Sequence, residues 1–270
     1  MRFKIANYFF YRCAVCNHTF VWPPPDEVAA AIYDDDYFRG ARGVVYPDYI
    51  ADGPLLRERG RRYGELLRRF GDPGSALDVG AAAGFFSQGL RDLGWRTVGL
   101  DPNASMTAFA RANGLDVRSG ELEQFESAEP FEAIMMIQVA AHFRDLRAAL
   151  ERAAAVTRPG GLWLFETWNA ASLNARLFGA AWHAYAPPST LRAFSPRSLD
   201  IAAARFGFAR LARGRAWKPL SGSHAKAILA RLSSRSRLAR GAATLARMLP
   251  DRAVIQYPLG DAFWALYRKG

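Results

Sequence analysis

The stretch from Ala76 to Phe86 is the feature that most constrains this chain. It reads Ala-Leu-Asp-Val-Gly-Ala-Ala-Ala-Gly-Phe-Phe and predicts a buried strand, a turn bounded by two glycines, and the start of a helix. Farther on, Val98-Gly-Leu-Asp-Pro102 predicts a second buried strand that ends on a carboxylate, Asp101. The two segments together are typical of an α/β domain that binds a nucleotide at the carboxyl ends of its parallel strands.

Three residues of these segments have predicted roles in such a site. Gly80 allows a sharp turn without a side chain in the way, and Gly84 lets the following helix begin close to the ligand. Asp101, at the tip of the second strand, is placed to accept hydrogen bonds from ribose hydroxyls. The turn reads G-x-A-x-G instead of the G-x-G-x-x-G of a pyrophosphate site, so it does not predict a dinucleotide.

The pattern Asp78-x-Gly80-x-Ala82-x-Gly84 resembles the first motif of the class I S-adenosylmethionine (SAM) methyltransferases, D/E-x-G-x-G-x-G. Here Ala82 replaces the middle glycine. The later segments of that family follow in order. They are a third strand at Leu115–Arg118, an acidic turn at Gly120–Glu123, a fourth strand at Phe131–Gln138, a helix at Arg144–Val156, an Arg-Pro-Gly-Gly turn at 158–161 and a fifth strand at Leu162–Thr167.

The resemblance implies an α/β, Rossmann-like fold. We expect a seven-stranded, mostly parallel sheet with helices on both faces and an antiparallel final strand. The sixth and seventh strands are predicted at Phe208–Arg213 and Ala262–Arg268. Residues 51–217 would form the SAM-binding core, and residues 259–270 would supply its last strand.

The resemblance also assigns the cofactor site. Glu121 and Leu122 would flank the adenine, Asp101 would hold the ribose and Gln138 would line the methionine part. The residues expected to bind SAM are Asp78, Gly80, Ala82, Gly84, Phe85, Asp101, Pro102, Glu121, Leu122 and Gln138.

Two outlying segments narrow the resemblance to methyltransferases that act on sugars and other small metabolites. One is Tyr11–Phe20, at the position where that group often carries a small zinc module. The other is Trp182-His-Ala-Tyr-Ala-Pro-Pro188. The implied reaction is O-methylation of a sugar, polysaccharide or lipid-linked intermediate. Candidate substrate contacts are Asn169, Trp182, His183 and Tyr185, and core packing is the favoured alternative for the two large aromatic residues among them.

The chain departs from this group at the end of the fourth strand. The usual Asp-x-x-Glu-His reads Gln138-Val-Ala-Ala141-His142, and a histidine that often follows the two prolines is Thr190. His142 is the remaining candidate for a general base, because its ordinary pKa lies near neutral pH; it could equally be a histidine that opens the next helix. The lost acids also leave open a catalytically degenerate SAM-binding partner protein.

The zinc module is incomplete in this chain. A structural zinc needs four ligands, and the sequence holds two cysteines, Cys13 and Cys16, with His18 as a third candidate. Either the natural start lies upstream and carries further ligands, or residues 1–50 are an extension with a decayed site. Zinc is therefore an open expectation.

The excess of positive charge lies in the last third of the chain. Residues 171–270 hold 17 basic and 3 acidic side chains, within a total net charge of +11. Residues 218–258 predict a basic, amphipathic helical insertion, with a helix over Ala225–Leu249. It could be a solvated cover on the core, a membrane-surface helix or a lid that steers an anionic substrate.

The charge also bears on partners and location. Residues 213–252 could contact an anionic membrane or an acidic glycan. An RNA methyltransferase is the rival function, disfavoured because the arginines lack interleaved aromatic residues. With no apolar run long enough to span a membrane and no signal-peptide core, we expect a cytoplasmic, reduced protein, peripheral to a membrane if the basic segment binds one.

Overall fold

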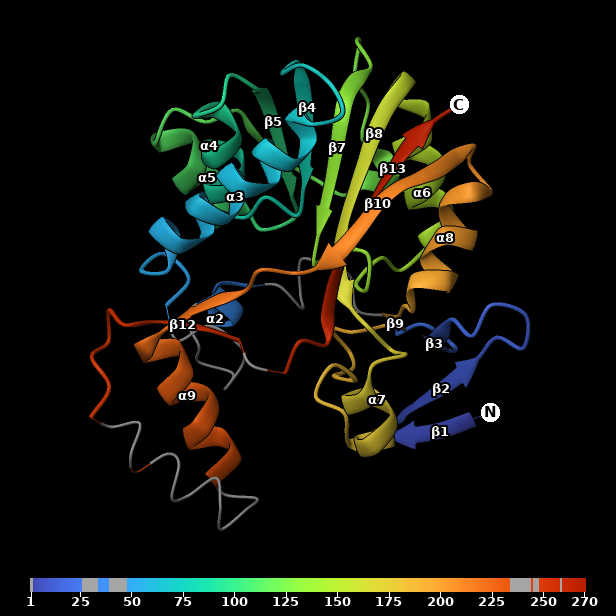
Figure 1. Ribbon diagram of the computed structural model, residues 1–270, viewed down its shortest axis with the longest axis vertical. Helices are drawn as coiled ribbons and strands as arrows, with labels where there is room; N and C mark the ends of the chain where they lie inside the picture. The colour runs from blue at the N-terminus through green and yellow to red at the C-terminus, as the bar shows by residue number, and fades with distance from the viewer. Residues whose placement is uncertain (1, 26–33, 39–47, 234–243, 245–247, 258) are drawn as a thin grey trace.

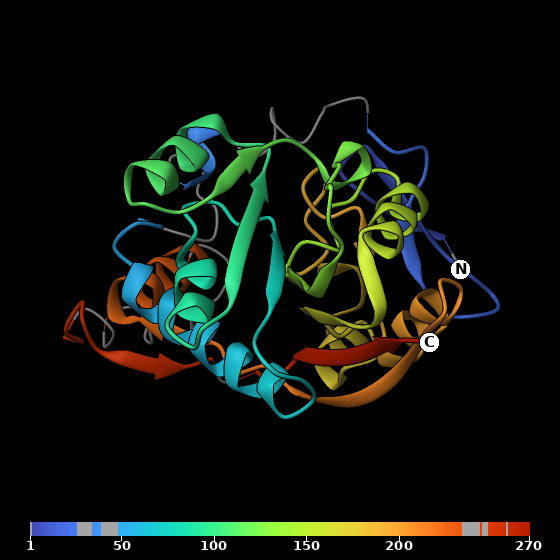
Figure 2. The same cartoon turned by 90° about the horizontal axis from the view of Figure 1, so that it is seen from above.

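The computed structural model describes residues 2–25, 34–38, 48–233, 244, 248–257 and 259–270. Its centre is a seven-stranded sheet with helices on both faces (Figures 1 and 2). In spatial order the strands are β10 (Phe208–Arg215), β13 (Ala262–Lys269), β8 (Thr157–Trp168), β7 (Phe131–Ile137), β4 (Ser75–Val79), β5 (Arg96–Asp101) and β6 (Val117–Ser119).

The pairing of these strands confirms the predicted sheet. Strands β6, β5, β4, β7 and β8 pair in parallel with their neighbours. Strand β13 runs antiparallel to both β8 and β10, so it is the final, reversed strand. The carboxyl ends of the parallel strands therefore meet at one edge, which is where a ligand binds in folds of this kind.

Two helical layers bury the sheet. One face carries α3 (Gly53–Arg68), α4 (Phe85–Arg91) and α5 (Ala104–Ala112), and the other carries α6 (Leu146–Ala155) and α8 (Pro196–Ala204). Strand β7 shows why both layers are needed. Its residues alternate, so that Ala133 and Met135 pack toward the first layer and Ile134 and Met136 toward the second. A strand that is apolar on both sides must be covered on both sides.

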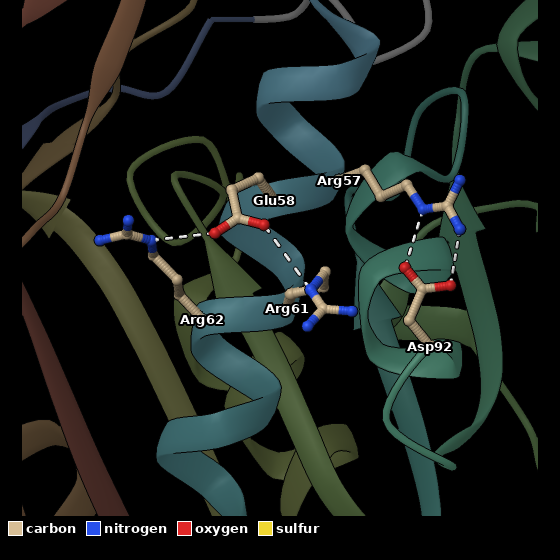
Figure 3. Close-up of polar contacts among 5 residues, drawn as sticks. All are labelled: Arg57, Glu58, Arg61, Arg62 and Asp92. Atoms are coloured by element: carbon tan, nitrogen blue, oxygen red, sulfur yellow. Dashed lines mark hydrogen bonds and ion pairs between the residues drawn. The ribbon is translucent and has the colours of Figure 1, made fainter.

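Helices α3 and α4 cross at close range because of two glycines. A Cβ atom on Gly89 would lie 2.2 Å from the main-chain oxygen of Arg57, and one on Gly60 would lie 2.5 Å from that of Phe86. The Arg57 guanidinium also donates two hydrogen bonds, of 2.7 and 2.8 Å, to the Asp92 carboxylate at the end of α4 (Figure 3).

On the exposed side of α3, one carboxylate faces two arginines. Arg61 and Arg62 lie 3.6 and 3.2 Å from the Glu58 carboxylate (Figure 3). Both ion pairs lie within α3, and pairs this exposed contribute little to stability.

A second layer lies below the carboxyl edge of the sheet (Figure 1). It contains a four-stranded antiparallel sheet of β1 (Arg2–Ile5), β2 (Tyr8–Arg12), β3 (Thr19–Val21) and β9 (Arg192–Ala193). Its other elements are α2 (Asp35–Phe38), α7 (Leu173–Phe178), η2 (Gly179–Ala181), the paired strands β11 (Pro219–Ser221) and β12 (Val254–Gln256), and α9 (Gly222–Ser233). The short η1 (Leu122–Gln124) belongs to the main layer, where it packs against α6.

Some predicted boundaries shift for local reasons. Helix α6 begins at Leu146 instead of Arg144, because the Asp145 side chain caps it by accepting the main-chain N–H of Ala148 at 3.0 Å. Helix α9 begins at Gly222 instead of Ala225, after Ser221, whose hydroxyl accepts the N–H of His224. The rest of the predicted helix to Leu249 lies mostly outside the described residues.

Candidate functional site

The turn after β4 is built from three left-handed residues. Gly80, Ala82 and Gly84 have φ angles of 74°, 47° and 78°. Gly80 is exposed at the carboxyl edge, as expected for a residue under a ligand. A Cβ atom on Gly84 would lie 2.5 Å from Cδ1 of Leu115, so glycine is needed there for packing behind the turn, away from the ligand side that the sequence suggested.

Asp101 ends β5 and ties this turn to the next helix. Its Oδ2 accepts the main-chain N–H of Ala82 at 2.8 Å, and its Oδ1 accepts that of Asn103 at 2.8 Å. Burial raises the pKa of this carboxyl to about 6. Each oxygen retains acceptor capacity, so the carboxylate can take ribose hydroxyls while it holds the turn.

A hollow of about 470 Å³ opens beside Asp101. Its lining residues are Asp34, Asp35, Asp36, Pro102, Asn103, Ala104 and Ser105. Asp35 closes one wall by accepting hydrogen bonds from the Asn103 amide at 3.3 Å and the Ser105 hydroxyl at 3.0 Å. The predicted cofactor residue Pro102 thus borders an open cavity.

The other predicted cofactor residues support the same edge. Asp78 is buried and accepts the Ser87 hydroxyl at 2.8 Å, which fixes the start of α4, and burial raises its pKa to about 7. Phe85 packs against Tyr49 and Phe109, with ring centroids 5.9 and 6.3 Å away.

Of the two residues predicted to flank the adenine, Leu122 is buried and opens η1, and Glu121 is half-buried just before it. These positions, the open turn at Gly80 and the carboxylate of Asp101 fit SAM at this edge of the sheet.

Gln138 follows β7 in a left-handed conformation, with φ of 59°. Its side-chain amide donates to Oε1 of Glu166 at 2.8 Å, and its main-chain N–H donates to the Glu166 carbonyl at 2.8 Å. Arg59 donates to both carboxylate oxygens of Glu166, at 2.8 and 2.7 Å, and the Tyr63 hydroxyl donates to Oε2.

The Glu166 carboxylate stays ionised although it is fully buried. Burial opposes its charge, but Arg59 and the nearby ammonium of Lys218 lower its pKa below the ordinary value. Arg59, Tyr63, Glu166 and Lys218 were absent from the sequence prediction. Glu166 could have been found from the sequence, because it is a carboxylate inside an otherwise apolar strand.

His142 lies in the loop after β7, and its Nδ1 is 2.6 Å from the carbonyl oxygen of Ser189. Burial lowers the pKa of its imidazole. The histidine ties this loop to the segment before β9, and its predicted role as a base stays a prediction.

The candidate substrate residues occupy different surroundings. Trp182 and Tyr185 are 1% and 7% exposed and lie in the core of the N-terminal sheet, where Tyr185 packs against both Phe3 and Phe10. Their position favours core packing for both. Asn169 donates its main-chain N–H to the carbonyl of Asp261 at 2.7 Å, at the end of β8.

His183 differs from its neighbours because its side chain is 43% exposed. Its imidazole packs edge-on against Trp168, with centroids 4.7 Å apart. Nearby lies a hollow of about 530 Å³, lined by Arg215, Ala216, Trp217, Gln256, Tyr257, Gly260 and Ala262. Of the predicted acceptor contacts, His183 is thus the one that presents a titratable group to solvent.

The cysteines do not assemble a metal site with the neighbouring histidine. Cys13 and Cys16 lie in the β2–β3 turn, whereas the His18 ring packs on Phe194, with centroids 4.6 Å apart. Within the described ranges, no group of three or more His, Cys, Asp or Glu side chains is placed to hold a metal. The structure therefore does not support the zinc expectation.

The basic insertion is anchored to the core at its start. His224 of α9 is buried against Asp52, at the start of α3, with Nδ1 3.2 Å from Oδ2. Lys226 pairs with Asp251 at 2.8 Å. Among the residues that the structure describes, no helix is long and apolar enough to cross a membrane.

The comparisons with known proteins agree with this geometry. A family model described as "Methyltransferase domain" matches residues 55–212. A ubiquinone biosynthesis O-methyltransferase from Bradyrhizobium sp. (strain ORS 278) is 35% identical over 99 residues, which cover 34% of this chain and 39% of that protein. The match thus spans about two fifths of that relative's length.

Solved structures share the fold. A SAM-dependent methyltransferase from Archaeoglobus fulgidus has a TM-score of 0.54 and 16% identity, covering 90% of this chain and 100% of that one. Magnesium protoporphyrin IX methyltransferase from Synechocystis PCC 6803 was solved with bound S-adenosylhomocysteine (SAH). It has a TM-score of 0.54 and 12% identity, and the match covers 87% of this chain and 94% of that one. Because the family model matches more than half of the chain, this protein belongs to the class I SAM-dependent methyltransferases.

Proposed function

We propose that this protein transfers a methyl group from SAM to an oxygen of a small-molecule acceptor. The observation that carries the proposal is the shared edge formed by the Gly80–Gly84 turn, the Asp101 carboxylate and Gln138. The name of the Bradyrhizobium relative, an O-methyltransferase, supports oxygen as the methylated atom. A sugar, polysaccharide or lipid-linked intermediate is the acceptor class that we propose to test first.

The chain's own residues would divide the binding between them. Asp101 would accept the ribose hydroxyls, Glu121 and Leu122 would flank the adenine, and Gln138 would face the methionine part. When bound, SAM supplies an electrophilic methyl group, and its sulfur keeps the bonding electron pair as the methyl passes to the acceptor. The remaining contribution of the protein is to align acceptor and donor, which by itself lowers a barrier substantially.

Cofactor binding is the first test. S-adenosylhomocysteine (SAH) should bind the parent protein with micromolar affinity in calorimetry. Asp101→Ala should weaken that affinity at least about tenfold, because it removes a charged hydrogen-bond acceptor. Asp116→Ala is the matched control, since that carboxylate is exposed and pairs locally with Arg118. Absence of binding in a folded parent sample would refute the proposal.

We also propose that the basic segment of residues 213–252 contacts an acidic surface beside the site. Support comes from the ten basic residues and one acid in that range, and from Arg213 and Arg215, which are exposed on the edge strand β10. Co-sedimentation with vesicles of anionic phosphatidylglycerol, against neutral phosphatidylcholine, tests the membrane form of the proposal. Equal recovery with both vesicle types would contradict it.

A further inference from the structure

A second group of polar side chains lies next to the Gln138–Glu166 pair, where β8 ends and β13 begins. Asp261 immediately precedes β13 and is fully buried. Its Oδ2 accepts the indole N–H of Trp182 at 2.9 Å and lies 3.8 Å from Nδ1 of His183. At that distance the buried carboxylate acts on the imidazole through its charge, which favours the tautomer with the proton on the nearer nitrogen, Nδ1.

The other ring nitrogen of His183 faces a hydroxyl. Its Nε2 lies 3.4 Å from the Tyr257 hydroxyl oxygen. In the tautomer with its proton on Nδ1, the nitrogen nearer Asp261, Nε2 is the nitrogen with a lone pair to offer. Because the side chain is 43% exposed, an acceptor hydroxyl can reach Nε2 from the open side of the site.

An ammonium group stands beside this histidine. Nζ of Lys218 lies 4.0 Å from the ring centroid of Trp168, the residue that packs edge-on against His183. The described residues accept no direct hydrogen bond from Nζ of Lys218. Burial lowers the pKa of this ammonium to about 8, so it is mostly charged at neutral pH and has three N–H donors for an incoming oxygen.

The surroundings of His183 lower the pKa of its imidazole, with burial as the largest cause. The groups that face it are the Asp261 carboxylate, the Lys218 ammonium and the Tyr257 hydroxyl. Burial lowers the pKa of His183, and Lys218 adds to that effect, whereas Asp261 opposes it. A neutral imidazole at neutral pH is the form that can accept a proton.

The group is also adjacent to the predicted cofactor edge. Glu166 accepts a hydrogen bond from the Gln138 side chain. Trp168 lies two residues after Glu166 on the same strand, β8. Lys218 is close enough to Glu166 and Asp261 for both carboxylates to raise its pKa. The polar side chains around His183 and those around Gln138 therefore form one continuous polar cluster.

We propose that His183 is the general base for the acceptor hydroxyl, that Asp261 positions it, and that Lys218 holds the oxygen that loses its proton. The inference rests on the proposed function and adds residues to it. In the proton step the acceptor O–H bond breaks, the proton forms an N–H bond at Nε2, and the electron pair stays on the oxygen beside Lys218. The exposed imidazolium then returns its proton to water.

The first test uses 4-nitrophenol as a probe, because its anion and neutral form absorb at different wavelengths. With SAH present at pH 6, the parent should bind the probe largely as the anion. Lys218→Gln and His183→Gln should each weaken anion binding about tenfold, the loss of one charge-assisted contact. Arg176→Gln is the control, since it removes an exposed charge on α7 and should leave binding unchanged.

The second test reads the tautomer of His183 directly. Nitrogen NMR of ¹⁵N-histidine-labelled protein, assigned with His183→Gln, should show a neutral ring with its proton on Nδ1. Asp261→Asn should alter that tautomer population, and a variant that fails to fold leaves the parent spectrum as the decisive result. A proton on Nε2 in the parent, or unchanged probe ionisation in His183→Gln, would overturn the proposal. Loss of SAH binding in the parent would instead refute the proposed function.

Discussion

Gln138, which directly follows β7, and Glu166, in the neighbouring strand β8, are joined by two hydrogen bonds. The side-chain amide of Gln138 donates to Oε1 of Glu166 and its main-chain N–H donates to the Glu166 carbonyl, each across 2.8 Å. Gln138 replaces an acid expected at this position from the family pattern. An acid there would place a second carboxylate against Glu166, and like charges at that range repel. The amide instead lets Glu166 keep its charge for Arg59.

Glu166→Gln should destabilise the fold by about 3–5 kcal/mol, because it leaves the Arg59 guanidinium buried without its counter-ion. Urea unfolding measures the difference in the free energy of unfolding. Glu58→Gln is the matched control, since Glu58 also faces two arginines but on the exposed side of α3 (Figure 3), and should change stability by less than about 1 kcal/mol. Equal losses in the two variants would show that burial of the pair is not what matters.

Gly89→Ala should cost about 1–3 kcal/mol through overpacking. The new Cβ would lie 2.2 Å from the main-chain oxygen of Arg57, so α3 and α4 would have to separate. Gly71→Ala is the control, because nothing lies within 4 Å of a Cβ there, and it should be neutral or slightly stabilising. Chemical unfolding measures the free energy of unfolding of the two variants. A Gly89→Ala variant as stable as the parent would contradict the close crossing of α3 and α4.

Ala82→Gly should stabilise the protein by up to about 1 kcal/mol, because the φ of 47° is strained for a residue with a Cβ. Ala83→Gly, at an equally buried neighbour without a positive φ, should instead destabilise by about 0.5–1 kcal/mol through added chain entropy. Thermal unfolding distinguishes the signs. The same sign for both would mean that Ala82 is not strained.

The central, covered position of three strands was predictable from this sequence because each is largely apolar on both sides. The runs at Leu77–Val79, Phe131–Ile137 and Leu162–Thr167 have no other stable place than the middle of a covered parallel sheet. The reversed last strand came from the family resemblance, and the pairing of β13 between β8 and β10 confirms it.

The polar cluster was harder to predict because its members are far apart in the chain. Arg59 and Glu166 are 107 residues apart, and nothing local marks them as partners. Glu166 inside an apolar strand did carry a signal, since a buried charge requires a partner. Lys218 gave no such signal, because at the start of a basic insertion it looked like one more solvated charge.

The roles of single residues in the site followed from motif position only in part. Asp101 lies at the predicted strand tip, but Gly84 serves the packing of Leu115. The large aromatic residues after β8 illustrate the same limit. Trp182 and Tyr185 pack in the core, whereas His183 between them is exposed, a difference that spacing alone does not reveal.

Asp78→Asn should stabilise the protein at pH 8. Burial raises the folded pKa of Asp78 to about 7, against an ordinary value of 3.8. A carboxyl with a raised folded pKa binds its proton more tightly in the folded state, so the parent loses stability as pH rises from about 4 to about 7. Asparagine has no charge to desolvate, and its oxygen can still accept the Ser87 hydroxyl. The expected gain is about 2–4 kcal/mol at pH 8 and close to zero below pH 4, read from urea unfolding at several pH values. Asp72→Asn is the control, because Asp72 is exposed, and its stability change should not depend on pH. A gain in Asp78→Asn that does not grow with pH would contradict the raised pKa of the buried Asp78 carboxyl.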